Sequence, residues 1–93
     1  MQIKSDFTIQ KVGSTYVAVA VGETSKTFHA MIKLNETGAF LWEKLAEADL
    51  TEEQLTAALL NEYDVDRETA AGDVHRFAEL LDQNGILQYE PKN

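Results

Sequence analysis

The 93-residue chain lacks several features that would point to a particular chemistry. It has no cysteine, which excludes disulfides, cysteine-ligated zinc and a thiol nucleophile. It has no run of about 18 apolar residues that would span a membrane, and its N-terminus lacks the apolar core of a signal peptide. Basic residues are few: 8 Lys and Arg stand against 16 Asp and Glu, and the net charge of −8 repels nucleic-acid phosphates. We therefore expect a cytoplasmic protein with no nucleic-acid and no membrane partner.

The residues that are present favour a small folded protein. Hydrophobic residues make up 44% of the chain and aromatic residues 9%, which is more than a disordered chain contains. The length fits one domain over residues 1–93. The charge is uneven, because residues 1–34 sum to +2 and residues 35–93 to −10. The acid therefore belongs to the second part of the chain.

The first third has the alternating pattern of β-strands. Apolar residues alternate with polar ones from Phe7, and Gly13-Ser14 fits a two-residue hairpin turn. A β-branched run follows over 15–21, and alternation returns over 28–34. The pattern predicts strands at 7–12, 15–21 and 28–34, arranged as an antiparallel meander with the third strand at an edge.

The remainder has helical spacing and helix-capping signals. Asn35, Thr51 and Asp66 each suit an N-cap, Gln54 completes a capping box with Thr51, and Asn84-Gly85 is a typical stop. These signals predict helices at 36–48, 52–63 and 67–84, followed by a short strand or tail. The predicted class is an α+β domain with a winged-helix-like arrangement.

The sequence offers no constellation for catalysis. Its two histidines, His29 and His75, make a poor metal site without cysteine, and no serine sits in a nucleophile elbow. No glycine-rich nucleotide motif is present. The helix at 67–84 has a net charge of −2, which disfavours DNA as its partner. We expect no catalytic residue, no metal, no cofactor and no enzymatic activity.

A binding role remains, and the edge strand suggests its form. An exposed edge recruits an extended peptide as an additional strand through backbone hydrogen bonds. The alternative is that Lys33 and the neighbouring helix merely protect the edge.

Two segments give the chain a family resemblance. LNETGAFLWEKL, from Leu34 to Leu45, resembles the strand-to-helix junction of the PqqD-like family. The downstream sequence resembles the rest of that pattern. It has a Thr-capped helix, a Tyr-Asp-Val-Asp turn, an Asp-Val-x-x-Phe helix and a final Gly-Ile-Leu segment. The resemblance covers about residues 28–88, whereas the first two strands carry little of it.

The resemblance implies a non-catalytic peptide chaperone, or recognition element, in the biosynthesis of ribosomally made, modified peptides. Members bind the leader of a precursor peptide as a strand between the third strand and the third helix, and present it to a modifying enzyme. Partners of this kind are radical SAM enzymes, as in pyrroloquinoline quinone biosynthesis, or leader peptidases. Carried over to this chain, the peptide-binding residues are Phe28, His29, Ala30, Met31, Ile32, Lys33, Arg67, Ala71, Val74, His75 and Ala78.

Within that set, the resemblance makes Ala30 and Ile32 the floor of the pocket and Ala71, Val74 and Ala78 its wall. Simpler interpretations stay open: Val74 is also explained as core, and Arg67, Lys33 and His75 as solvated surface. The whole chain is alternatively a structural or regulatory interaction module of winged-helix type that binds neither a leader nor DNA. An exposed edge strand also allows a homodimer.

Overall fold

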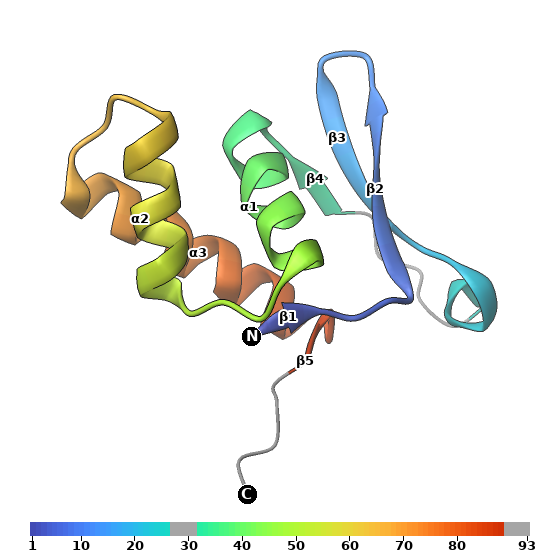
Figure 1. The fold of residues 1–93 in the computed structure, drawn as a ribbon. Helices are drawn as coiled ribbons and strands as arrows, with labels where there is room; N and C mark the ends of the chain where they lie inside the picture. Colours follow the sequence, from blue (N-terminus) through green and yellow to red (C-terminus); the bar gives the residue numbers. More distant parts are fainter. Residues whose placement is uncertain (27–31, 89–93) are drawn as a thin grey trace, which may run out of the picture.

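The computed structural model describes residues 1–26 and 32–88 of the chain. In the described part, a small sheet is followed by three helices, and α1 lies between the sheet and the other two helices (Figure 1). The elements are β1 (Gln2–Ile3), β2 (Phe7–Val12), β3 (Thr15–Ala20), the 3₁₀ helix η1 (Gly22–Lys26), β4 (Ile32–Leu34), α1 (Glu36–Glu47), α2 (Glu52–Glu62), α3 (Arg67–Gln83) and β5 (Leu87–Gln88). The α+β class predicted from the sequence is confirmed.

The three central strands form the predicted meander. β3 lies between β2 and β4 and pairs antiparallel with both, so β4 is an edge strand. Val12 faces Thr15 across the two-residue turn, in which Gly13 has a φ of 64°. A glycine with positive φ at the first turn position is what a type II′ hairpin requires. The part of the predicted third strand at 28–31 lies outside the described residues.

The sheet turns one face toward the helices. The buried residues on this face are Phe7 of β2, Ala18 of β3, and Ile32 and Leu34 of β4, and all four belong to the core. The alternating residue Lys33 is exposed, which is the period-2 pattern expected of a half-buried strand. The opposite face of the sheet carries Val12, which is 60% exposed, so no helix covers that end of the hairpin.

Each helix begins where its capping residue predicts and ends one residue before the predicted end. Asn35 accepts a hydrogen bond from the Gly38 N–H at 2.8 Å. Thr51 and Gln54 bond reciprocally to each other's backbone N–H groups at 3.1 Å and 2.9 Å. Asp66 caps α3, and hydrogen bonds from the Thr69 side chain and backbone hold the pKa of its carboxyl below the usual value. These local bonds satisfy N–H groups that a helix start leaves unpaired.

The helical core is apolar and continuous with the sheet. Trp42 and Leu45 of α1, Leu55 and Leu59 of α2, and Leu81 of α3 are all buried in one cluster with the inward residues of the strands. Trp42 is 2% exposed. Among the described helices, none is long and apolar enough to cross a membrane.

A second, two-stranded sheet was not predicted. β1 pairs antiparallel with β5, so Gln2 faces Gln88 and Ile3 faces Leu87 (Figure 1). The Lys4 N–H donates to the Ile86 carbonyl at 3.0 Å, and the Ile86 side chain is fully buried. This pairing brings the first residues of the chain against the end of α3.

Candidate functional site

β4 is an edge strand of the sheet, and a cavity lies beside it. β4 is three residues long, and among the described strands its backbone pairs with β3 alone. On its other side, the space toward α3 holds a cavity of about 270 Å³. For scale, an engineered cavity of about 150 Å³ accepts a benzene molecule. The cavity beside β4 therefore has room for a large side chain supplied from outside.

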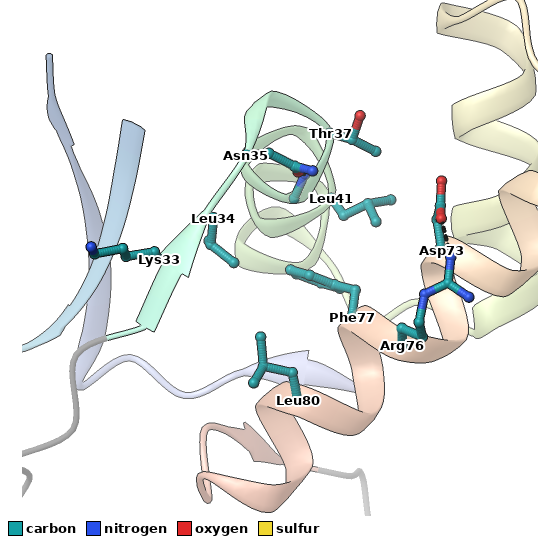
Figure 2. Close-up of a pocket in the computed structure, with 10 residues that line it drawn as sticks. Lys33, Leu34, Asn35, Thr37, Leu41, Asp73, Arg76, Phe77 and Leu80 are labelled. Carbon is teal, nitrogen blue, oxygen red and sulfur yellow. Dashed lines mark hydrogen bonds and ion pairs between the residues drawn. The ribbon is translucent and has the colours of Figure 1, made fainter. Parts of the chain in front are cut away.

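The cavity is built by three elements (Figure 2). β4 and the start of α1 form one wall, and one face of α3 forms the other. Phe77 and Leu80 point from α3 toward Leu34 and Leu41 and form the apolar part of the lining. The rest of the lining is polar. The complete lining is Lys33, Leu34, Asn35, Thr37, Gly38, Leu41, Asp73, Arg76, Phe77 and Leu80.

The start of α1 comes close to β4 because position 38 has no side chain. A Cβ built on Gly38 would lie 3.3 Å from both Cβ and Cδ2 of Leu34, which is tighter than ordinary packing. The close approach of helix and strand gives a packing reason for the glycine at this position. The tight junction fixes the position of β4 relative to α1, and thereby one wall of the cavity.

Charged groups lie at the rim. Arg76 forms an ion pair with Asp73, three residues earlier on α3 (Figure 2). Lys33 projects away from the helix toward the outer face of the sheet, where it also borders a depression of about 410 Å³ whose lining includes Val17 and Val19. In the part of the chain that the structure describes, no carboxylate pairs with the Lys33 ammonium. The rim thus carries one neutralised cation and one that is available.

The predicted site residues do not all lie at the cavity. Phe28, His29, Ala30 and Met31 lie outside the described residues. Lys33 lines the cavity, whereas Ile32 is buried in the core and is not among the lining residues; its neighbour Leu34 takes that place.

The predicted residues of α3 lie on the other side of that helix. Val74 is completely buried in the core, as its alternative interpretation held. His75 lies 3.2 Å from Glu52 of α2 and 3.4 Å from Glu79, and with Ala78 it borders a depression beside α2. Arg67 and Ala71 are exposed at the start of the helix. The predicted wall is therefore not the wall of the cavity, and a peptide contact by these five residues stays a prediction.

The residues that do form the α3 wall were missed as a group. Asp73, Arg76, Phe77 and Leu80 recur at spacings of three and four, which places them on one face of the helix. Phe77 is buried. The signal in the sequence is Leu80, an apolar residue three positions after Phe77 and therefore on the same side of α3. In the structure Leu80 is 36% exposed. An exposed leucine on a stripe that includes a buried phenylalanine indicates a face that is only half covered.

The described residues offer little for catalysis by metal or by paired acids. They contain no group of three or more histidine, aspartate and glutamate side chains placed to hold a metal ion. The carboxylates nearest the cavity are Asp73, which is paired with Arg76, and those of the exposed helix surfaces. The arrangement is that of a binding surface: an open strand edge, a cavity with an apolar part, and a charged rim.

Comparison with known proteins places this arrangement in a family. The family model described as coenzyme PQQ synthesis protein D (PqqD) matches residues 16–87, which is most of the chain and includes both walls of the cavity. The chain belongs to the PqqD family. The comparison with curated proteins found no match.

A solved structure shares the PqqD-type fold. The structure titled "TbiB1 in Complex with the TbiA(beta) Leader Peptide" is 23% identical to this chain, with a TM-score of 0.72. The match covers 99% of this chain and 100% of that one. It therefore includes β1 and β2, which the family model does not reach, and the whole fold has a counterpart in a known structure.

Proposed function

We propose that this PqqD-family protein binds the leader segment of a ribosomally made precursor peptide and presents it to a modifying enzyme. The observation that carries the proposal is the free edge of β4 beside a cavity that is lined in part by the apolar residues Leu34, Phe77 and Leu80. Membership of the family supports it, and so does the likeness to a protein solved with a leader peptide bound. The protein acts by binding and is not itself the catalyst.

The binding mode that fits the geometry is strand addition. A peptide that pairs with the free side of β4 gains backbone hydrogen bonds that do not depend on its sequence. Its alternate side chains then point toward α3, where Leu34, Phe77 and Leu80 form an apolar surface. The sequence-independent bonds supply affinity, and the cavity supplies selectivity.

The modifying enzyme is a separate protein, either a radical SAM enzyme or a leader peptidase. Its recruitment is compatible with the bound peptide, because the peptide occupies only the groove between β4 and α3. Most of the acidic surface on α1 and α2 then stays accessible to a second partner.

Leu80 allows a direct test, because it lines the cavity and is already 36% exposed. Leu80→Asp should leave the fold intact but place a charge where an apolar leader residue packs. Burial of one large apolar side chain contributes about 1.5–3 kcal/mol, so we expect about ten- to a hundredfold weaker binding. The measurement is fluorescence polarisation with the labelled leader segments of the short precursors encoded near the gene.

Val65→Asp is the matched control. Val65 is 40% exposed, lies in the connection between α2 and α3, and does not line the cavity. This variant should bind as the wild type does. Amide shifts on titration should include Lys33, Leu34 and Leu80. Equal binding by both variants would contradict the groove. Failure of every neighbouring leader to bind would favour an interaction module without a leader.

A further inference from the structure

The outer face of β4 restricts the sequence of a bound peptide at positions that do not reach the cavity. Ile32 and Leu34 point into the core, so Lys33 between them points to the outer face of the sheet (Figure 2). A strand added beside β4 must alternate in the same way. Its side chains point alternately toward the cavity and toward the outer face of the sheet, beside Lys33.

The row of residues that ends at Lys33 has no negative charge. Gln10 of β2 faces Val17 of β3, and Val17 faces Lys33, so these three lie side by side across the sheet. Lys33 is exposed, and no carboxylate pairs with it within the described residues. The next member of this row would be a residue of the bound peptide. Opposite charges at neighbouring positions of adjacent strands stabilise a sheet, whereas like charges destabilise it.

The inward positions have a different requirement. Leu34 and Leu41 on one wall and Phe77 and Leu80 on the other present apolar atoms. A charged side chain directed there would lose its hydration without gaining a partner, which is unfavourable. Arg76 is already paired with Asp73 and does not change this requirement.

We infer that Lys33 is a specificity-determining residue that selects an acidic side chain in the bound peptide, flanked on both sides by apolar residues that face the cavity. The recognised class is an extended segment of the form apolar–acidic–apolar. This inference rests on the proposed function, because it presumes a strand added at β4. The overall charge of −8 opposes acidic peptides at long range, but salt screens that repulsion beyond about 10 Å at 0.1 M. The contact with Lys33 is short-range and persists.

The test is a selection from a displayed library of random dodecapeptides. Peptides are enriched on the wild-type protein and depleted on Leu80→Asp, so that the survivors depend on the cavity. We expect Asp or Glu between two apolar residues. A parallel selection on Lys33→Glu should yield Lys or Arg at that position. For individual peptides, Lys33→Glu should weaken the binding of a peptide with Asp or Glu at that position by about two- to fivefold. Replacing the acidic residue of the peptide by Lys or Arg should restore the affinity for Lys33→Glu.

Lys11→Glu is the matched control, since it makes the same change in net charge. Lys11 lies on β2, at the opposite edge of the sheet, above the Tyr16 ring. It should leave the affinity of the selected peptides unchanged. The role of Lys33 would be overturned, and the groove left standing, by either of two results. One is a set of cavity-dependent peptides with no enrichment of Asp or Glu. The other is an equal loss of affinity with Lys11→Glu. Absence of any peptide that distinguishes the wild type from Leu80→Asp would overturn the proposed groove, and the role of Lys33 with it.

Discussion

Replacing Gly72 by alanine should stabilise the protein, whereas the same replacement at Gly38 should destabilise it. Both glycines lie within helices, where glycine is less favourable than alanine by about 0.5–1 kcal/mol. At Gly72 the added Cβ would meet only the Arg76 guanidinium, with Nη1 at 3.4 Å, and that flexible side chain can move. The expected gain for Gly72→Ala is therefore close to the full difference in propensity.

At Gly38 the added Cβ meets a rigid neighbour. Cβ and Cδ2 of the buried Leu34 both lie at 3.3 Å, so the methyl group must push β4 away from α1. Overpacking of this kind costs about 1–3 kcal/mol, which exceeds the gain in helix propensity. We expect a net loss of about 1 kcal/mol, and a weaker affinity for any peptide that pairs with the displaced β4.

Urea denaturation with a common m-value measures both changes. In a domain of this size, 1 kcal/mol corresponds to a shift of about 4–8 °C in melting temperature, so thermal unfolding gives an independent check. The reasoning is refuted if Gly38→Ala raises stability as much as Gly72→Ala does. In that case the contact with Leu34 would not limit the approach of α1 to β4.

Two further predictions concern the helix caps. Thr51→Ala removes one half of the capping box with Gln54 and should lower the unfolding free energy by about 1 kcal/mol in urea denaturation; an unchanged midpoint would mean that water replaces the bond. The lowered pKa of Asp66 predicts a stabilising contribution that is complete above the ordinary pKa of an aspartate and is lost as the pH falls through the lowered value. The difference in unfolding free energy between the wild type and Asp66→Asn should therefore shrink as the pH falls from about 5 through the ordinary aspartate pKa to the lowered one, and a constant difference would contradict the assignment.

The features that could be predicted from the sequence depend on neighbours along the chain. Asn35, Thr51 and Asp66 cap helices through bonds to residues three positions away, so a short stretch of sequence contains both partners. The alternation around Lys33 is equally local. The pairing of β1 with β5 joins two-residue strands from the two ends of the described chain, and such short strands have no periodicity to read.

The residues that line the cavity from α3 are harder to predict, for a different reason. α3 has two apolar faces, because Val74 and Ala78 pack on the side of the core and α2 while Phe77 and Leu80 face the cavity. Periodicity identifies both faces but does not say which one lies opposite β4. That depends on the rotation of α3 about its axis, which the packing of α2 and α3 sets. Charged residues at the cavity rim, such as Arg76, also look like ordinary surface in the sequence.

The open edge of β4 links occupancy to stability. On the proposed function, a bound peptide stabilises the folded state alone, and at a hundred times its dissociation constant it adds about 2.7 kcal/mol to the unfolding free energy. The same peptide covers an unpaired strand edge, the feature by which sheets most readily join one another. Self-association through β4 and peptide binding would then compete for one row of backbone groups. The loaded protein would be both harder to unfold and less prone to aggregate than the free one.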